Sequence, residues 1–407
     1  MTSRDRVLTA LDHRQPDRVP VDFSSHRSSG IMAIAYAKLK EHLGIDTGDI
    51  YVYDMVQQLA IVEPAVLDRL GVDLIELGRG FALDEGYWTD WQLPDGTPCK
   101  VPACLNVEET DGDWHILSDD GTEIAVQREG SLYFEQTHWP LRDIGTSDFS
   151  DLEQHLPRCM WTAVGSPPAP MSFDSPDFKQ GARQLRDSTD RAIVGLFGGN
   201  LHEMGQFLFG IDQWMMMLAG NPERAHRFLD AVTEMHLQNL ETFLQSAGPH
   251  IDVIMFGDDL GMQTGPQISR EMYEEFFQPR HARLWNRAHE VADLPVMLHC
   301  CGGVYELLPS LIEAGLDAIN PVQISARGMD PHRLKAEFGD DMVFWGGGCD
   351  THRILPQASP REVREHVREM VKILSPGGGF IFQQVHNIMS DVPPANILAM
   401  FDAVNAP

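Results

Sequence analysis

The chain has 407 residues, enough for one large α/β barrel with insertions or for two ordinary domains. Its formal net charge of −29 argues against nucleic acid or an anionic membrane surface as a partner, because both attract lysine and arginine. The six cysteines do not form a secreted disulfide framework, and no signal-like apolar segment opens the sequence. We therefore expect a cytoplasmic protein with reduced thiols.

Helical and extended patterns alternate in the first 77 residues. Helices are expected at residues 4–12, 32–43 and 64–70, and strands at 17–23 and 71–77. The polar loop over 24–30 follows the first of these strands. It offers His26 and Arg27 as substrate-binding side chains.

The composition changes between residues 84 and 140, where short alternating runs are separated by turn signals. Pro94-Asp-Gly96 and Asp119-Asp-Gly121 are two of these signals, and they predict β-hairpins. We expect one barrel domain over residues 1–407 with a β-hairpin insertion at 84–140. The insertion is either a wall over the strand ends or a surface decoration. Residues 157–178, rich in proline and serine, are expected to form a loop.

Strands and helices alternate again after residue 190. Expected strands are centred on Val19, Leu74, Ile193, Val253, Val296, Ala318, Val343 and Phe380. Eight such units predict an α/β fold, a (β/α)₈ TIM barrel with a small β-rich insertion, although the pattern alone also fits a doubly wound sheet. In a barrel the active site lies at the C-terminal strand ends.

Side chains able to bind a metal follow three of the expected strands. His299 and Cys301 form a His-x-Cys pair after the fifth strand, while Cys349 and His386 follow the seventh and eighth. Zinc prefers thiolate and imidazole ligands, and a catalytic site keeps one position open. These residues predict a metal site built on His299 and Cys301, with Cys349, His386 or both. A buried cysteine also occurs as a small hydrophobe, which we expect of either Cys300 or Cys301 because successive strand residues face opposite ways.

Carboxylate and amide side chains lie near other strand ends. Asp258 and Asp259 would act as acid or base, bind a cationic group, or orient a metal-bound histidine. Glu203 offers a further oxygen ligand for the metal, although a glutamate at a helix start also stabilises the helix dipole. Further candidate substrate-binding residues are His202, Gln323 and Asn387.

Several motifs resemble those of the uroporphyrinogen decarboxylase superfamily. They are Gly257-Asp-Asp-Leu-Gly261, His299-Cys-Cys-Gly302, Asn320-Pro-Val-Gln323, Gly346-Gly-Gly-Cys-Asp350, Pro376-Gly-Gly-Gly-Phe380 and His386-Asn-Ile. The resemblance covers nearly the whole chain and is weakest at 84–140 and 157–190. It implies a (β/α)₈ barrel with its site at the C-terminal strand ends.

The superfamily includes tetrapyrrole decarboxylases and zinc-dependent, corrinoid-linked methyltransferases. The decarboxylases carry an arginine-rich N-terminal segment, whereas the corresponding loop of this chain has one arginine, Arg27. The methyltransferases bind zinc through His-x-Cys and a distant cysteine, and His299 and Cys301 match the first two ligands. In the coenzyme M type the last cysteine lies where this chain has His386, so Cys349 is the candidate for the second thiolate.

The resemblance therefore implies a zinc-dependent methyltransferase that moves a methyl group between a small methylated substrate or thiol and a corrinoid protein. The corrinoid, a cobalamin-type cofactor, is expected on a partner, because this chain has no Asp-x-His-x-x-Gly cobalamin signature. Two alternatives stay open. One is a metal-free decarboxylase with Arg27 and Arg79 on the substrate, and the other is a non-catalytic tetrapyrrole-binding protein. A homodimer is one option for the oligomeric state.

Overall fold

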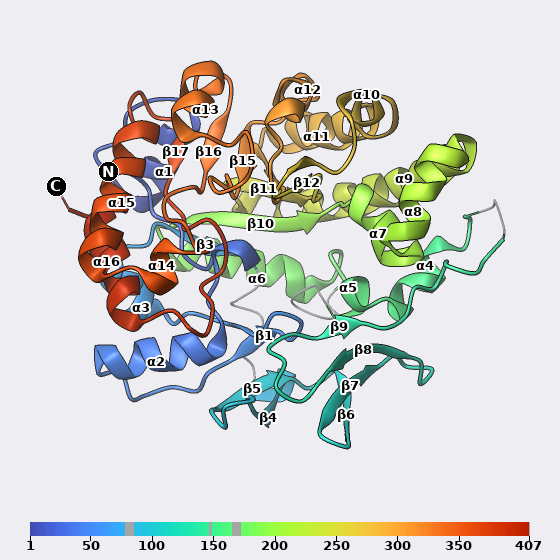
Figure 1. The fold of residues 1–407 in the computed structure, drawn as a ribbon, viewed down its shortest axis with the longest axis horizontal. Coiled ribbons are helices and arrows are strands. Elements are labelled where there is room, and N and C mark those ends of the chain that lie inside the picture. The colour runs from blue at the N-terminus through green and yellow to red at the C-terminus, as the bar shows by residue number, and fades with distance from the viewer. Residues whose placement is uncertain (78–84, 146–148, 165–171, 407) are drawn as a thin grey trace.

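A parallel sheet of seven strands forms the centre of the molecule, in the spatial order β17-β16-β15-β14-β11-β10-β3 (Figure 1). The computed structural model describes residues 1–77, 85–145, 149–164 and 172–406. The strands of the sheet are β3 (Leu74–Glu76), β10 (Ala192–Gly198), β11 (Val253–Gly257), β14 (Val296–His299), β15 (Ala318–Asn320), β16 (Val343–Trp345) and β17 (Phe380–Ile381). Each is one of the strands expected from the sequence.

The remaining expected strand, at residues 17–23, contains an extended segment between β3 and β17. Val21 forms an isolated parallel bridge with Phe382, and the Asp22 amide donates to the Phe382 carbonyl at 2.8 Å. On the other side, the Asp73 amide donates to the Val21 carbonyl at 2.8 Å. These contacts join the two edges of the sheet, so the predicted TIM-barrel fold is confirmed and the doubly wound sheet is excluded.

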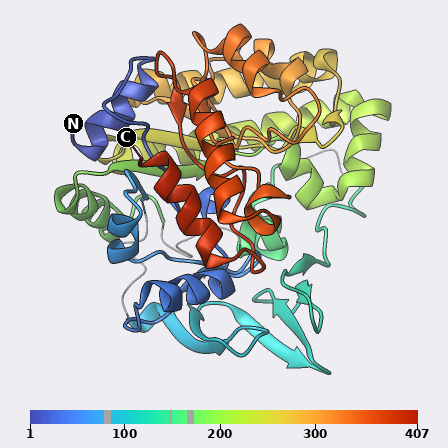
Figure 2. The same ribbon diagram turned by 60° about the vertical axis from the view of Figure 1, so that its left-hand side comes forward.

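Helices cover the outside of the barrel (Figures 1 and 2). The longer helices are α1 (Ser3–Leu11), α2 (Ala33–Leu43), α3 (Pro64–Arg69), α6 (Pro176–Ser188), α7 (His202–Phe209), α8 (Ile211–Gly220), α9 (Pro222–Ala247), α11 (Gln278–Ala292), α12 (Leu308–Glu313), α13 (Pro331–Phe338), α15 (Pro360–Leu374) and α16 (Pro394–Val404). Shorter helices are α4 (Leu152–His155), α5 (Met160–Ala163), α10 (Arg270–Met272) and α14 (Ile354–Gln357). None of the helices in the described part of the chain combines the length and apolar character that a membrane crossing needs.

Local signals set several helix ends. Thr2 and Asp5 form a capping box at the start of α1, where the Asp5 amide donates to Thr2 Oγ1 at 3.1 Å. Ser359 and Glu362 form another at the start of α15. Gly44, with a φ of +69°, ends α2 in the left-handed conformation that glycine adopts without steric cost.

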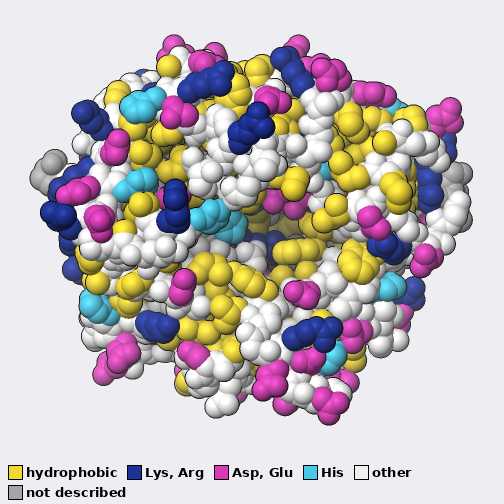
Figure 3. Space-filling view, in the orientation of Figure 1, with side chains coloured by type: hydrophobic (Ala, Val, Ile, Leu, Met, Phe, Trp, Pro, Cys, Tyr) yellow, Lys and Arg dark blue, Asp and Glu magenta, His cyan; other side chains and the backbone are white. Residues whose placement is uncertain are grey.

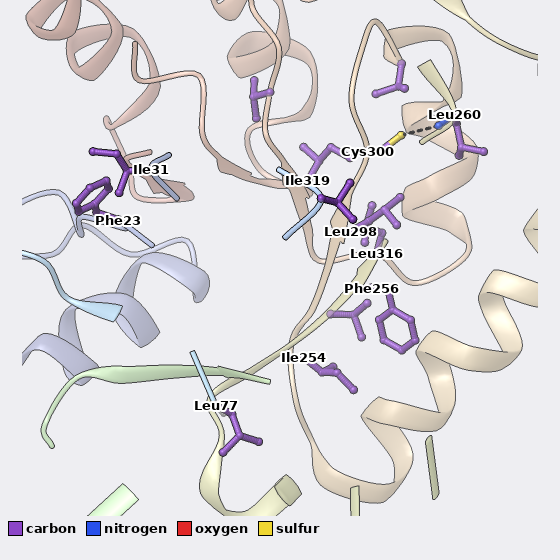
Figure 4. Packing of buried hydrophobic residues seen from close by; sticks show 14 of the residues in the cluster. Phe23, Ile31, Leu77, Ile254, Phe256, Leu260, Leu298, Cys300, Leu316 and Ile319 are labelled. Carbon is purple, nitrogen blue, oxygen red and sulfur yellow. Dashed lines mark hydrogen bonds between the residues drawn. The ribbon is translucent and has the colours of Figure 1, made fainter. Parts of the chain in front are cut away.

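The barrel interior is filled by alternate strand residues. This interior cluster contains Leu74, Ala192, Val194, Val253, Met255, Met297, Ala318, Val343, Trp345 and Ile381, and residues Val7, Ala10 and Leu11 of α1 pack against it. The intervening residues, among them Phe256, Leu298 and Ile319, belong to the larger core that also contains helix side chains (Figure 4). This alternation also sets the direction of the side chains beyond the last strand residue.

Antiparallel strands of residues 88–136 gather at one side of the molecule, at the bottom of Figure 1. They form a hairpin, β4 (Trp88–Gln92) and β5 (Pro98–Pro102), and a four-stranded sheet, β6 (Asn106–Thr110), β7 (Asp113–Leu117), β8 (Glu123–Gln127) and β9 (Glu135–Gln136). Two small hairpins lie elsewhere: β1 (Val52–Asp54) with β2 (Leu59–Ala60), and β12 (Gly261–Met262) with β13 (Gly265–Pro266). The predicted β-rich insertion is therefore present.

The loop expected at residues 157–178 is wrong at both of its ends, and its residues 165–171 lie outside the described part of the chain. The 3₁₀ turn Leu156–Arg158 and helix α5 occupy its first residues, and α6 begins at Pro176. Ser175 caps α6, because its side chain accepts the Phe178 amide at 3.1 Å. The proline and serine content of this segment favoured a loop, so the composition did not predict these helices.

Candidate metal centre and substrate cavity

Strand alternation separates the two adjacent cysteines after β14. Leu298 belongs to the core outside the barrel (Figure 4). Because successive strand residues face opposite ways, His299 faces the interior side. Cys300 continues the outward face, where it is buried and its Sγ accepts the Leu260 amide at 3.2 Å. Cys301 turns back, and its Sγ lies 3.4 Å from His299 Nε2.

Three side chains bring potential ligand atoms together at this end of the barrel. One such atom from each of His299, Cys301 and His386 lies within 4.8 Å of the other two. The two imidazole rings are 5.9 Å apart between centroids. In a tetrahedral zinc site with bonds of about 2.0–2.3 Å, neighbouring ligand atoms are roughly 3.3–3.8 Å apart. The three side chains therefore fit one zinc ion after small rotations, with a fourth position open.

Both histidines have Nδ1 occupied, which leaves Nε2 for a metal. His299 Nδ1 lies 2.8 Å from Oδ1 of Asn320, and His386 Nδ1 lies 2.8 Å from Oδ1 of Asn387. An amide oxygen only accepts hydrogen bonds, so each Nδ1 carries the proton and each Nε2 presents a lone pair. The orientation of the Asn320 amide is fixed because its nitrogen donates to the backbone carbonyl of Trp345 at 2.9 Å, and the Asn387 nitrogen donates to Gln57 Oε1 at 2.9 Å. Metal-binding histidines are oriented in the same way.

A chain of buried polar groups lies behind Asn320. Ser28 Oγ donates to Asn320 Oδ1 at 2.9 Å, and His26 Nδ1 lies 3.1 Å from Ser28 Oγ. His26 Nε2 is 3.1 Å from Asp22 Oδ2, and Trp345 Nε1 donates to the same carboxylate at 2.8 Å. Burial alone would raise the pKa of Asp22, but His26 holds it below its usual value. His26, expected to bind substrate, is completely buried in this chain.

Asp258 stabilises the start of α7. Its two carboxylate oxygens accept the amides of His202 and Glu203, each at 2.9 Å. Burial alone would raise its pKa, yet the pKa of Asp258 lies below the usual value because His281 Nε2 is 3.2 Å away. Both oxygens are thus engaged, and Asp258 is absent from the described lining of the cavity beside the metal group.

Asp259 and Glu203 do line that cavity. Asp259 Oδ1 accepts the Cys301 amide at 2.7 Å and lies 3.8 Å from His299 Nε2. Glu203 Oε2 accepts a hydrogen bond from Asn200 Nδ2 at 2.6 Å. Burial raises the pKa of Glu203 well above its usual value, and the neighbouring aspartates add to the shift, which favours a protonated carboxyl group. Glu203 is not among the three residues of the metal group in the described part of the chain.

Cys349 and Gln323 lie beside the site. Cys349 is completely buried, contributes no atom to the metal group found among the described residues, and has a thiol pKa raised by burial. Gln323 Oε1 accepts the Gly302 amide at 2.7 Å, so this side chain holds the loop that carries Cys301.

His202 and Arg27 also have partners within the protein. Trp214 Nε1 donates to His202 Nδ1 at 3.0 Å, so the other ring nitrogen carries the proton and lies 3.3 Å from Gln267 Oε1. Burial lowers the pKa of His202. Arg27 lines the cavity, and its Nε lies 2.6 Å from Asp54 Oδ2. Arg79 lies outside the described residues.

The loops after β11 and β14 touch backbone to backbone. A Cβ on Gly261 would lie 2.4 Å from the Cys301 carbonyl oxygen, and a Cβ on Gly302 would lie 2.3 Å from the Gly261 carbonyl carbon. Gly302 also has a φ of +88°, which favours glycine. The close approach places Cys301 beside His299.

A cavity of about 730 Å³ adjoins the metal group. The ends of β10 and β11 and helices α5 and α7 line it, and one face of the molecule is hollowed near its centre (Figure 3). Its aromatic side chains are Trp161, Phe173, Phe178, Phe197, Phe207 and Phe256. No residue of β4 to β9 belongs to the described lining, so the described wall comes from these other segments. The volume is typical of a small-molecule site.

Burial sets the protonation states of the metal group. It raises the pKa of the Cys301 thiol well above its usual value, and the charge of Asp259 acts in the same direction. Burial lowers the pKa of His299, and that of His386 to about 4. Without metal the group thus holds a thiol and two neutral imidazoles, and a bound divalent ion would displace the thiol proton.

Comparison with protein families gives one match over much of the chain. The sequence profile of the uroporphyrinogen decarboxylase (URO-D) family matches residues 179–407, more than half of the length. This chain belongs to the uroporphyrinogen decarboxylase family. The resemblance predicted from the sequence motifs is confirmed.

Individual relatives include both methyltransferases and decarboxylases. A methylated-thiol–coenzyme M methyltransferase of Methanosarcina mazei is 31% identical over 163 residues, 40% of each chain. A uroporphyrinogen decarboxylase of Alkalilimnicola ehrlichii is 26% identical over 189 residues, 46% of this chain and 48% of the relative. The matches thus span about half or less of these relatives. A solved methyltransferase from Methanosarcina mazei shares the fold, with a TM-score of 0.58 at 15% identity over 100% of this chain and 98% of that one.

Sequence reasoning missed the residues that support and surround the metal group. Asn320 stood in a motif used only for the family resemblance, although its place at a strand end was a signal for a polar role. Gln57, which accepts from Asn387 Nδ2 at 2.9 Å, comes from a distant segment with no motif. Trp161 was hidden in a segment expected to be a loop, and Phe207 had no signal beyond helical spacing.

Proposed function

We propose that this protein is a zinc-dependent methyltransferase of a corrinoid-linked system. It moves a methyl group between a small methylated substrate or thiol and a corrinoid carried by a partner protein. The observation that carries this proposal is the group of His299, Cys301 and His386, in which both histidines present Nε2. Two nitrogens and one sulfur with an open position are typical of catalytic zinc. The M. mazei relative, a methylated-thiol–coenzyme M methyltransferase, supports the same reaction class.

Zinc in this group would supply a Lewis acid that lowers the pKa of a thiol or polarises the oxygen or sulfur of a methylated substrate. Asn320 and Asn387 hold the two imidazole rings with Nε2 toward the ion. Gln323 holds the loop after β14 through the Gly302 amide. The aromatic wall of the cavity excludes water from the reacting groups.

Proton handling belongs to the carboxyl groups that line the cavity. The sequence offered Asp258 and Asp259 for this role, and the geometry favours Asp259, because Asp258 accepts two backbone amides of α7. Glu203, whose pKa burial raises, holds a proton beside Asp259 and donates it to a leaving oxygen or sulfur.

The proposed reaction requires a corrinoid, and we expect a partner protein to carry it. A cytoplasmic location and a homodimer also stay predictions from the sequence.

Methyl exchange with free cobalamins tests the function. Methylcobalamin is offered with thiols, and reduced cobalamin is offered with methyl ethers and thioethers, while the cobalamin spectrum is followed. We expect exchange that stops on chelation and returns with zinc. A folded His299→Ala/Cys301→Ala variant should be inactive. Equal exchange by zinc-free protein would refute the proposed role of the metal.

A metal-free decarboxylase is the second candidate, because several relatives are uroporphyrinogen decarboxylases. Its polycarboxylate substrate needs several cations in the cavity. Arg27 is the one lysine or arginine in the described lining, and it already pairs with Asp54 at 2.6 Å. Release of CO₂ from a porphyrinogen by chelator-treated protein would favour this candidate over methyl transfer.

A further inference from the structure

The wall of the cavity beside the metal group is rich in partly exposed aromatic rings. Trp161 and Phe207 stack with ring centroids 5.6 Å apart and an interplanar angle of 25°. Phe173 and Phe197 lie 6.4 Å apart between centroids. All four are only partly buried and line the cavity, so ring surface remains available to a ligand. Such surface binds flat apolar groups by stacking and edge contacts.

The charged groups of the cavity disfavour an anionic ligand. Arg27, the one lysine or arginine of the described lining, has its Nε 2.6 Å from the buried carboxylate of Asp54. Glu203 and Asp259 are the carboxyl groups in the same lining. Away from the metal group, a sulfonate or carboxylate entering here would lose water without gaining an unpaired lysine or arginine of the described lining, which is a large cost in a buried site.

The volume also exceeds the needs of a two-carbon thiol. About 730 Å³ lies in the range of cavities that hold molecules with one or more rings. A ring placed against Trp161 and Phe207 would share the cavity with His299 and His386, which line it too.

The proposed metal also limits which functional group the ligand can carry, and this step rests on the proposed function. A group that the ion polarises must present a lone pair, as the oxygen of an ether or the sulfur of a thioether does. A quaternary ammonium has no lone pair and carries a charge that a zinc ion repels.

We propose that this cavity takes a neutral aromatic compound bearing an O-methyl or S-methyl group. The ring lies against Trp161 and Phe207, and the methylated atom faces the open position of the group formed by His299, Cys301 and His386. The two acids and the paired arginine select against small anionic thiols.

Binding by calorimetry tests the proposal without turnover. The probes are methoxybenzene, methylthiobenzene, coenzyme M and tetramethylammonium, each titrated into the zinc-loaded full chain. We expect the two aromatic probes to bind at least tenfold more tightly than the other two. Trp161→Leu should weaken aromatic binding about tenfold, as loss of a stacking partner does, and Trp161→Phe should restore most of it. Trp114→Leu, a matched change in β7 outside the described lining, should leave binding unchanged.

Two results would overturn the substrate class: coenzyme M or tetramethylammonium binding more tightly than both aromatic probes, or aromatic binding that Trp161→Leu leaves unchanged. The proposed function fails separately. If aromatic probes bind through Trp161 but no methyl group reaches cobalamin, the proposed ligand class is supported and the proposed methyltransferase function is refuted. Methyl exchange with coenzyme M at full rate in Trp161→Leu would keep the methyltransferase and reject the aromatic substrate.

Discussion

Replacing Asn387 tests whether the amide groups behind the histidines support a metal. In Asn387→Ala the Nδ1 proton of His386 loses the acceptor that lies 2.8 Å away. A buried donor left without a partner costs about 1–3 kcal/mol, and loss of such supporting contacts weakens metal binding by about 10–100-fold. The free-energy cost and the loss of affinity agree, because about 1.4 kcal/mol corresponds to a factor of ten in a dissociation constant. Competition with a zinc chelator would measure the change.

Two further variants separate this effect from general damage. Asn387→Asp keeps an acceptor for His386 Nδ1 and should bind zinc about as tightly as the unchanged protein. Asn405→Ala removes an amide that donates to the carbonyls of Leu70 and Phe401, neither of which belongs to the metal group, and should not change zinc affinity. A folded Asn387→Ala protein with unchanged zinc affinity would refute the orienting role.

Three more predictions concern the stability of the protein in acid, the roles of Cys301 and Cys349 in zinc binding, and the close approach of Gly302 to the backbone of Gly261. Burial lowers the pKa of His236 to about 4 from its usual 6.5, so the unfolded chain binds a proton that the folded chain excludes. The contribution of neutral His236 to the free energy of unfolding is complete above about pH 6.5 and falls by roughly 3 kcal/mol toward pH 4. Denaturant titrations that show a constant free energy of unfolding between these pH values would contradict this. Cys349→Ala should retain zinc while Cys301→Ala loses it, by elemental analysis of folded proteins, and the reverse result would place the thiolate ligand after β16 instead of β14. Gly302→Ala should lower the melting temperature much more than Gly130→Ala. Both glycines have a φ of at least +80°, but of the two only Gly302 would bring a Cβ against backbone atoms. Equal changes in melting temperature would contradict the close approach of Gly302 to Gly261.

Much of the barrel was predictable because its strands are short apolar runs followed by helices. Seven of the eight expected positions are strands in the central sheet. The strand expected at residues 17–23 forms a single bridge, because side chains bind some of its backbone groups. The Val21 amide, for instance, donates to the Asp73 carboxylate at 2.9 Å. The helical segment formed by α10 and α11 is interrupted by a π-helical turn at Tyr273–Phe277, which periodicity alone does not reveal.

The site was predictable only where chemistry and strand position coincided. His299, Cys301 and His386 were candidates because they follow strands that end on one face. The sequence left Cys349 open as a ligand beside them, because its type and strand position are equally suitable. The direction of its side chain depends on packing, and in the fold it is completely buried.

Single sequence motifs did not predict the contacts between side chains of distant segments. Asp258 looked as available as Asp259, and only the position of α7 shows that its oxygens accept two amides. The aromatic wall joins α5, α7 and two strand ends, and no spacing rule connects Trp161 with Phe207.

Zinc content per chain tests the central claim most directly. The full chain and a folded His299→Ala/Cys301→Ala variant would be purified without chelator, exchanged into zinc-containing buffer, desalted and analysed for metal. We expect about one zinc per chain, retained by the unchanged protein and lost from the variant. Equal zinc in both proteins, or none in either, would contradict a metal centre at His299, Cys301 and His386.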